Sequence, residues 1–203
     1  MSSSKEQVTI VYAHPWDGSF SHAELEQVKQ TLTARHQDYN LIDLYADGFD
    51  PVMRAKDLSV YGKGDFKDPM VGEYIETIQK TNKLILMFPI WWLSMPAMLK
   101  GFFDKVFLAN RIINFVDKKA VPHTAVDSAM VLSTSELTND ELFKGYDGSV
   151  EQIVNFPLES IGAKKVTWHN MGDIIVAKRP ALEDYLKQLP SDVNAFLDNE
   201  PNA

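Results

Sequence analysis

Short, almost uniformly apolar runs alternate along this chain with longer amphipathic runs, and this alternation constrains the fold more than any other feature. Such apolar runs are typical of strands covered on both faces in a parallel sheet and connected by helices. The predicted strands are 8–13, 41–44, 83–88, 125–132 and 165–171, and the predicted helices are 23–32, 97–108, 149–161 and 180–197. The pattern indicates a flavodoxin-like three-layer α/β sandwich, a five-stranded parallel sheet in the order 2-1-3-4-5 with helices on both faces.

The remaining segments fit one continuous unit. Residues 47–69 are rich in Gly, Asp and Pro, and we expect them to form a long excursion over the edge of the sheet. No internal repeat, low-complexity tract or linker interrupts the sequence. We therefore expect residues 1–203 to form a single flavodoxin-like domain, with residues 198–203 as a frayed tail.

The composition excludes several classes of site and partner. The chain has no cysteine, which rules out disulfides, thiolate catalysis and cysteine-ligated metals. Its formal net charge of −8 argues against a nucleic-acid partner, because nucleic-acid binding draws on clustered Lys and Arg. We expect no metal site, because four of the histidines are scattered without metal-ligand spacing, namely His22, His36, His123 and His169.

The N-terminal stretch MSSSKEQ is polar and lacks the apolar core of a signal peptide. No run approaches the roughly 20 apolar residues that a membrane-spanning helix needs. We therefore expect a cytoplasmic protein without a membrane span. The basic pairs Lys118-Lys119 and Lys164-Lys165 fit either solvated surface or a phosphate contact.

The segment AHPWDGSFS, residues 13–21, joins the first predicted strand to the first predicted helix. A loop at this place presents backbone N–H groups and the positive end of a helix dipole, which together favour a phosphate group. Gly18 permits a tight turn, and His14 can donate to a phosphate oxygen. Ser19 and Ser21 add hydroxyl donors, although an ordinary helix N-cap explains them equally well. The segment matches neither GxGxxG nor a Walker A loop.

The segment FPIWWLSMPAMLKGFFDKVF, residues 88–107, places two tryptophans directly after a predicted strand and between two prolines. Open α/β sheets bind flat ligands at this end of their strands. Core packing is the alternative for any single aromatic ring. Because successive residues of an extended segment cannot both point into the core, we expect at least one of Trp91 and Trp92 to face a crevice or a partner subunit.

A third loop, STSELTND at residues 133–140, follows the fourth predicted strand. It offers hydroxyl groups and backbone amides at the same edge of the sheet as the other two loops. A capping segment before a short helix accounts for it equally well. The predicted topology brings all three loops to one side of the sheet.

The sequence patterns at these loops resemble those of a known family. The family pattern A-H-P-x(3)-S-F-[NS] appears here as AHPWDGSFS, and F-P-[IL]-x-W followed by P-A-x-[LM]-K-G-x-[FI]-[DE]-[KR]-V-F appears as FPIWWLSMPAMLKGFFDKVF. The segment DLYADGFDPVM is similar to the family's D-L-Y-x-x-G-F-x-P. Over nearly its whole length the chain thus resembles the flavodoxin-like NAD(P)H:quinone oxidoreductases, which include DT-diaphorase and the bacterial general-stress quinone reductases.

This resemblance implies a bound flavin, FMN or FAD with a preference for FMN, and NAD(P)H as co-substrate. The family's phosphate-contacting positions correspond to His14, Ser19, Phe20 and Ser21. The segment that lies along the isoalloxazine ring corresponds to Pro89, Ile90, Trp91, Trp92 and Leu93. The loop at the pyrimidine end of the ring corresponds to Ser133, Thr134, Ser135 and Glu136.

The chain departs from the family at three places. The family's T-T-G-G in the third loop retains only Thr134 and loses both glycines. An aromatic pair that the family supplies to the neighbouring subunit's substrate pocket retains only Phe115, so we expect the pocket to be lined by Trp92 and Phe115. Tyr146 is the nearest match to a tyrosine that assists proton transfer in the DT-diaphorase branch.

The activity that the resemblance implies is that of an NAD(P)H dehydrogenase (quinone). A hydride passes from NAD(P)H through flavin N5 to a quinone or another electron-poor aromatic molecule, with two-electron ping-pong kinetics in a homodimer. Three alternatives stay open: a reductase of azo or nitro compounds on the same flavin, a flavin-binding regulatory subunit of a membrane transporter, and a scaffold without a cofactor.

Overall fold

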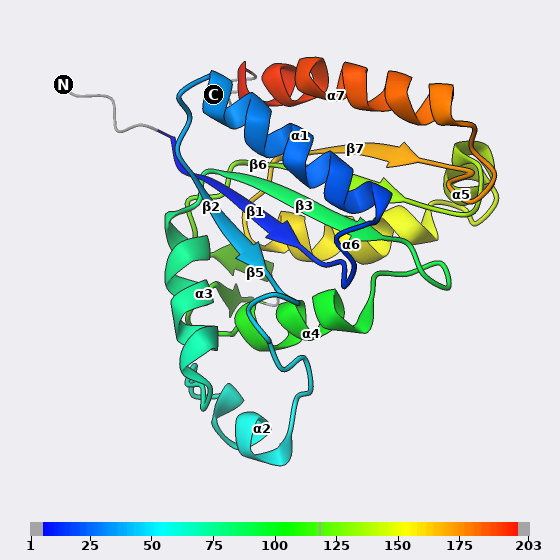
Figure 1. Ribbon diagram of the computed structural model, residues 1–203. Helices are drawn as coiled ribbons and strands as arrows, with labels where there is room; N and C mark the ends of the chain where they lie inside the picture. The colour runs from blue at the N-terminus through cyan, green and yellow to red at the C-terminus, as the bar shows by residue number, and fades with distance from the viewer. Residues whose placement is uncertain (1–5, 118, 199–203) are drawn as a thin grey trace.

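The computed structural model describes residues 6–117 and 119–198. Its central feature is a five-stranded parallel sheet in the order β2-β1-β3-β6-β7 (Figure 1). The strands are β1 (Val8–Tyr12), β2 (Tyr39–Asp43), β3 (Lys83–Pro89), β6 (Ser128–Thr134) and β7 (Lys165–Met171). Counted among the sheet strands alone, this is the order 2-1-3-4-5, so the predicted flavodoxin-like sandwich is confirmed.

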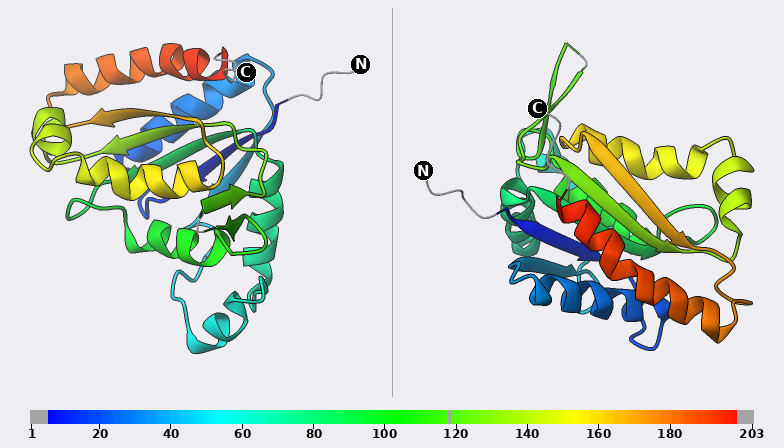
Figure 2. Two further views of the ribbon diagram at one scale, coloured as in Figure 1. Left: turned by 180° about the vertical axis from the view of Figure 1, so that it is seen from behind. Right: turned by 90° about the horizontal axis from the view of Figure 1, so that it is seen from above.

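Helices cover both faces of this sheet (Figures 1 and 2). Two long helices, α1 (Phe20–Ala34) and α7 (Arg179–Asp198), pack side by side on one face. The opposite face carries α3 (Pro69–Lys80), α4 (Ala97–Val106) and α6 (Ser149–Ser160). Two short helices complete the set, namely α2 (Ala55–Tyr61) and α5 (Asn139–Lys144).

The central strand β3 shows why the sequence folds in this way, because all of its residues are buried. Successive side chains of a strand point to opposite faces, so an uninterrupted apolar run fills two cores. Leu84 and Leu86 join the core under α3, α4 and α6, whereas Ile85 and Met87 join the core under α1 and α7. Each fully buried side chain of this kind contributes about 1.5–3 kcal/mol.

The fourth sheet strand lies further along the chain than the sequence pattern predicts. The expected strand 125–132 is observed as Ser128–Thr134. Ala125 donates its backbone N–H to the Gln79 carbonyl oxygen, and Val126 donates to the Thr124 hydroxyl, so residues 124–127 form a connection instead of a strand. The strand therefore extends to Thr134, which places more of the third loop inside the sheet than we expected.

The helices α2 and α3 and the strands β4 and β5 were not predicted from the sequence. The excursion 47–69 contains α2, in which the Asp57 carboxylate accepts a hydrogen bond from the Arg54 backbone N–H at 3.0 Å. It leads into α3, where Asp68 is the N-cap and Pro69 occupies the first turn. An antiparallel hairpin of β4 (Ile113–Val116) and β5 (Lys119–Pro122) follows α4.

Parts of the sequence predictions fall outside the described residues, namely Lys118 of the first basic pair, the N-terminal residues 1–5 and the expected tail beyond Asp198. Within 6–117 and 119–198, no helix combines the length and the apolar character needed to cross a membrane.

Candidate functional site

Three loops meet at the carboxyl ends of the central strands, on the right of the sheet in Figure 1. They connect β1 to α1, β3 to α4, and β6 to α5. The strands end close together because they are in parallel register, with Tyr12 opposite Met87 and Pro89 opposite Thr134. The expected convergence of the three loops is therefore present.

The first loop ends in the N-terminus of the 15-residue helix α1. The Ser19 hydroxyl caps this helix by accepting a hydrogen bond from the His22 backbone N–H at 3.0 Å. The backbone N–H groups of Phe20 and Ser21 donate to no other group within the described part of the chain. These two amides point along the positive end of the helix dipole, where an anion is favoured.

His14 adds a side-chain donor to the same loop. Its Nδ1 accepts a hydrogen bond from the Trp16 backbone N–H at 3.1 Å, so the neutral ring carries its proton on Nε2. Burial lowers the pKa of His14 below the usual value for histidine. At neutral pH the ring is therefore an uncharged hydrogen-bond donor.

Trp16 belongs to this site and was not singled out in the sequence. Its indole lies against Gly18, where a Cβ atom would stand only 2.4 Å from the ring. The rest of the Trp16 side chain is exposed, and its own backbone carbonyl accepts from the Ser19 N–H at 3.1 Å. A tryptophan two residues before a glycine in a loop is the signal that could have indicated this contact.

The second loop is a tight turn at residues 91–94. The backbones of Trp91 and Ser94 exchange hydrogen bonds of 2.9 and 3.0 Å. Between them, Trp92 and Leu93 have φ angles of 52° and 58°, in the left-handed region that bulky residues rarely occupy. Such positions cost about 1–3 kcal/mol each and cluster at functional sites.

Neither tryptophan of this turn packs in the core. The side chain of Trp92 is 100% exposed and that of Trp91 is 43% exposed. The Trp91 ring meets His14 edge-on, with the two ring centroids 6.2 Å apart. The second loop thus lies directly beside the first and adds an aromatic wall to its donors.

The third loop begins with three buried residues, Ser133, Thr134 and Ser135, and continues with the exposed Glu136. The side chains alternate in direction. The hydroxyls of Ser133 and Ser135 are hydrogen-bonded to Asn170 of β7, whereas the Thr134 Oγ1 lies 3.4 Å from the Ser21 Oγ of α1. Thr134 therefore joins the third loop to the first.

The remaining two predicted site residues lie on connections other than these three loops. Phe115 is exposed on the β4–β5 hairpin, whose base bonds to Gln79 at the end of α3, near the amino ends of the strands. Tyr146 is 42% exposed on the connection between α5 and α6. The structure does not bring Phe115 to the three loops of its own chain.

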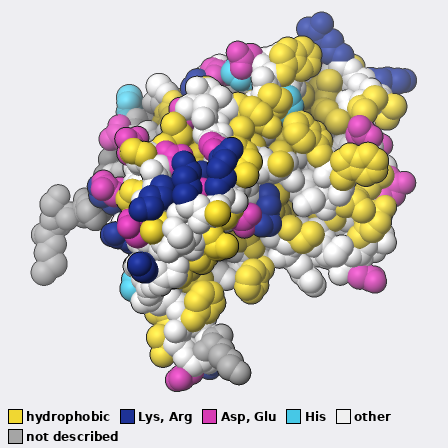
Figure 3. All heavy atoms as spheres, turned by 90° about the horizontal axis from the view of Figure 1, so that it is seen from below, with side chains coloured by type: hydrophobic (Ala, Val, Ile, Leu, Met, Phe, Trp, Pro, Cys, Tyr) yellow, Lys and Arg dark blue, Asp and Glu magenta, His cyan; other side chains and the backbone are white. Residues whose placement is uncertain are grey.

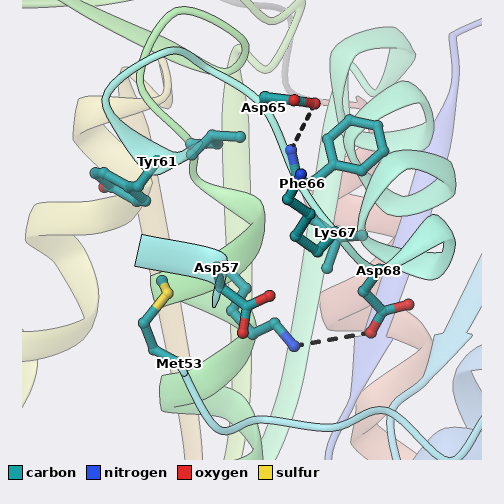
Figure 4. Close-up of a pocket in the computed structure, with 10 residues that line it drawn as sticks. Met53, Asp57, Tyr61, Asp65, Phe66, Lys67 and Asp68 are labelled. Carbon is teal, nitrogen blue, oxygen red and sulfur yellow. Dashed lines mark hydrogen bonds and ion pairs between the residues drawn. The ribbon is translucent and has the colours of Figure 1, made fainter. Parts of the chain in front are cut away.

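The small cavity drawn in Figure 4 is a different feature, of about 10 Å³, between the α2–α3 segment and α4. Lys105 is buried there and pairs with Asp68 at 3.7 Å, and its Nζ donates to the Asp50 carbonyl oxygen at 2.7 Å. The cavity is about the size of one water molecule. The two contacts of Lys105 anchor residues 47–69 to α4, away from the convergent loops.

No group of three or more His, Asp or Glu side chains suited to a metal ion is present in residues 6–117 and 119–198. The donors at the loop convergence are neutral amides, hydroxyls and one imidazole. Such a set suits a ligand that is anionic and accepts hydrogen bonds.

A sequence family described as having a flavodoxin-like fold matches residues 6–191. The chain belongs to this flavodoxin-like family. A curated relative, the uncharacterized NAD(P)H oxidoreductase YcaK of Escherichia coli (strain K12), is 30% identical over 122 residues, 60% of this chain and 61% of that protein. NAD(P)H dehydrogenase [quinone] 1 of Cavia porcellus is 28% identical over 174 residues, 74% of this chain and 61% of that protein.

In both alignments the flavodoxin-like chain spans less than two thirds of the relative's own length. These relatives confirm the resemblance to the flavodoxin-like NAD(P)H:quinone oxidoreductases. Among solved structures, NAD(P)H:quinone oxidoreductase from Methanothermobacter marburgensis has a TM-score of 0.82 at 23% identity, covering 94% of this chain and 98% of that one. An FMN-dependent NADH-azoreductase from Bacillus anthracis, in complex with FMN, has a TM-score of 0.79 at 16% identity, covering 96% of this chain and 100% of that one. These two structures share the fold.

Proposed function

We propose that this protein is a flavin-dependent NAD(P)H:quinone oxidoreductase with FMN as its cofactor. The observation that carries the proposal is the contact between the first and second loops. Two helix N-terminal amides, at Phe20 and Ser21, and the Nε2–H of His14 form an anion site, and the exposed Trp91 ring lies edge-on to His14. A phosphate group and a flat ring joined by a short linker match this pair of features.

The phosphate is assigned to the first loop. Neutral donors suit it because the helix dipole and oriented N–H groups stabilise negative charge without a cationic side chain. Within this assignment His14, Phe20 and Ser21 bind the phosphate oxygens, while Ser19 holds the start of α1. Trp16 fixes the loop by packing on Gly18.

The flat ring is assigned to the second and third loops, in contact with residues 89–93 and 133–136. The N–H groups of Trp92, Leu93 and Glu136 have no acceptor within the described ranges, and all three are available to a ligand. Such preorganised donors stabilise negative charge that develops during a reaction. They supply this stabilisation without an acid–base pair of side chains.

A bound flavin supplies the two-electron redox chemistry of the reaction. The protein residues orient the reactants and exclude water. Trp91 and Trp92 form an aromatic wall against which a nicotinamide or a quinone can stack. Tyr146 is the proposed proton donor to the reduced acceptor. We expect ping-pong kinetics, since two flat reactants that stack on one wall bind in turn.

The names of the relatives support this proposal. The E. coli relative is named an NAD(P)H oxidoreductase, the C. porcellus relative is named an NAD(P)H dehydrogenase [quinone], and the B. anthracis neighbour is named FMN-dependent. The last name favours FMN over FAD.

The quaternary structure is proposed to be a homodimer in which the hairpin of one subunit supplies Phe115 to the substrate pocket of the other. Exposed hydrophobic side chains gather in a broad area on the face seen from below in Figure 3. On that side of the sheet Ile153 and Phe156 of α6 are 45% and 71% exposed. An apolar area of this kind suits contact with a second copy of the chain. Light scattering measures the mass of the active protein. A fully active monomer would contradict the proposal that two subunits share the substrate pocket.

The visible spectrum tests the proposal. The purified protein is mixed with excess FMN or FAD, desalted and scanned. Retained flavin absorbance that NAD(P)H bleaches and menadione restores supports both cofactor and reaction. A protein that retains neither flavin contradicts the proposal. Retained flavin with negligible turnover points instead to the regulatory subunit of a transporter.

A second candidate function is the reduction of azo or nitro compounds on the same flavin. The full exposure of Trp92 favours it, because an open aromatic wall accepts flat rings of many kinds. The ratio of kcat/KM for menadione to kcat/KM for an azo dye such as methyl red decides between the two. A ratio below one selects the azoreductase.

A further inference from the structure

One buried amide side chain joins several segments of the chain beneath the third loop. Asn170, the penultimate residue of β7, is only 7% exposed. Its Oδ1 accepts a hydrogen bond from the Ser133 hydroxyl at 2.7 Å. Its Nδ2 donates to the Ser135 hydroxyl at 2.9 Å and to the Asn139 Oδ1 at 2.7 Å. Asn170 thus holds the end of β6, the loop after it and the first residue of α5.

The hydrogen bonds continue beyond Asn170 on both sides. The Trp168 indole N–H donates to the Ser133 hydroxyl at 2.7 Å. The Ser135 hydroxyl donates in turn to the Leu137 carbonyl oxygen at 2.7 Å. Buried polar networks in which the members are satisfied rigidify the structure around them.

The segment after β7 adds backbone bonds to the same loop. Ser135 donates its N–H to the Met171 carbonyl at 3.0 Å, and Ile174 donates back to the Ser135 carbonyl at 3.0 Å. Asp173 donates to the Leu137 carbonyl at 3.2 Å. The close approach depends on Gly172, where a Cβ atom would lie 2.9 Å from the Leu137 oxygen. In Figures 1 and 2, α5 accordingly lies at the ends of β6 and β7.

These bonds leave one side of the loop available. The hydroxyls of Ser133 and Ser135 and the carbonyl of Leu137 are all engaged on the side of β7. The backbone N–H groups of Glu136 and Leu137 donate to nothing in the parts of the chain that the structure describes. Glu136 is exposed and Leu137 is half-buried, so neither residue is enclosed in the core.

We propose that Asn170 is a positioning residue that sets ligand affinity at the third loop. The inference rests on the proposed function, because the ligand in question is the flavin. The loop has a side chain at every position from 133 to 139, so its shape has to be fixed by bonding. Asn170 draws both serine hydroxyls toward β7 and so holds the Glu136 and Leu137 amides in place for a carbonyl or anionic oxygen of the ring. Asn170 acts through the loop and does not itself contact the ligand.

The test compares Asn170→Ala with a matched control in the full-length chain. Asn82→Ala is the control, because the Asn82 side chain also accepts from a backbone N–H, that of Gln7 at 2.9 Å, and donates to a carbonyl, that of Ala125 at 3.4 Å. It lies next to the start of β3, at the opposite end of the sheet. Both variants should lower Tm, which is the purely structural effect.

FMN affinity, measured by quenching of flavin fluorescence, separates the two variants. Asn170→Ala should raise the FMN Kd by about tenfold, and Asn82→Ala by less than about twofold. An unchanged Kd in Asn170→Ala, or an equal rise in both variants, overturns the proposal. If Asn170→Ala does not fold, Ser135→Ala removes one arm of the network and should raise the Kd by about threefold, and an unchanged Kd there overturns the proposal as well.

Hydrogen exchange in the absence of flavin distinguishes this inference from the proposed function. The amides of Ser135, Asp173 and Ile174 should exchange faster in Asn170→Ala, or in Ser135→Ala, than in the wild type and in Asn82→Ala. Unchanged exchange at these amides overturns the positioning role. If the wild type binds no flavin at all, the proposed function fails, and the flavin-affinity part of this inference fails with it. Exchange then still decides whether Asn170 holds the loop.

Discussion

The Thr134 carbonyl oxygen accepts a hydrogen bond from the Ile90 backbone N–H at 2.8 Å. This bond continues the pairing of β3 and β6 one residue past the end of β3, so the second and third loops leave the sheet in a fixed register. The Thr134 hydroxyl lies 3.4 Å from that of Ser21, which ties the same point to the first turn of α1. One residue thus links the three loops that form the candidate site.

The contact between Trp16 and Gly18 predicts that the first loop is sensitive to a single methyl group. In Gly18→Ala the new Cβ would stand 2.4 Å from the indole, so the ring or the loop has to move. We expect the FMN Kd to rise by about tenfold, since the phosphate donors follow directly after this residue. Gly62→Ala is the control, because a Cβ there meets nothing within 4 Å. Equal affinities in the two variants would contradict the role of Trp16.

Because the backbone of Trp92 is left-handed, we predict that replacing this residue makes the protein more stable but less active. Asn tolerates this conformation better than Trp, and the exposed Trp92 ring loses no packing when it is replaced. Trp92→Asn should therefore raise the free energy of unfolding by about 1 kcal/mol in urea titrations. It should also lower kcat/KM for menadione, because the aromatic wall loses a ring. A variant that is both less stable and fully active would refute both halves of this prediction.

Glu24 predicts a pH dependence of stability. It is buried in α1, and burial raises the pKa of its carboxyl to about 8, against a smaller lowering by the neighbouring Tyr185 of α7. The pKa of Glu24 is higher in the folded state than in the unfolded state. The free energy of unfolding is therefore greatest below the unfolded-state pKa, where the carboxyl is protonated in both states, and it falls as the pH rises to about 8. One pKa unit corresponds to about 1.4 kcal/mol, so the loss is on the order of a few kcal/mol.

The Glu24→Gln variant tests this dependence, because it cannot ionise. Its free energy of unfolding should fall less than that of the wild type between about pH 5 and pH 8. Glu76→Gln, at an exposed position of α3, should follow the wild type. Parallel curves for Glu24→Gln and the wild type would show that the Glu24 carboxyl does not carry the effect.

Tyr146 is predicted to donate a proton to the reduced acceptor. Tyr146→Phe keeps the ring and removes the hydroxyl, so the rate of quinone reduction should fall by about tenfold or more in stopped-flow experiments. The rate of flavin reduction by NAD(P)H should not change, and neither should Tm, since the residue is on an exposed connection. Full activity in Tyr146→Phe would remove the residue from the mechanism.

The sequence alone determined the layers and the strand order. The apolar runs of β1 and β3 are long enough to demand cover on both faces, and the position of each loop after a strand then follows from the parallel topology. The sequence also predicted that at least one of Trp91 and Trp92 lies outside the core, because two adjacent rings cannot share one core face. Whether residues 1–203 form one domain stays a prediction.

The apolar pattern of the sequence did not predict the hairpin of β4 and β5 or the helices α2 and α3. Strands β4 and β5 are short and largely exposed, so they lack the apolar pattern by which the sheet strands were found. The excursion is held by the buried Lys105, whose partners Asp50 and Asp68 precede it by dozens of residues. Local composition does not reveal such contacts.

Only the tertiary structure decided which way the third loop faces. From the sequence, the hydroxyls of Ser133 and Ser135 were expected to be available to a ligand. In the structure both are hydrogen-bonded to Asn170, more than thirty residues further along the chain. The packing of Trp16 on Gly18 is likewise set by the turn of the backbone between them. Periodicity records which side chains are buried along one element, whereas hydrogen bonds between distant elements depend on how those elements are brought together in space.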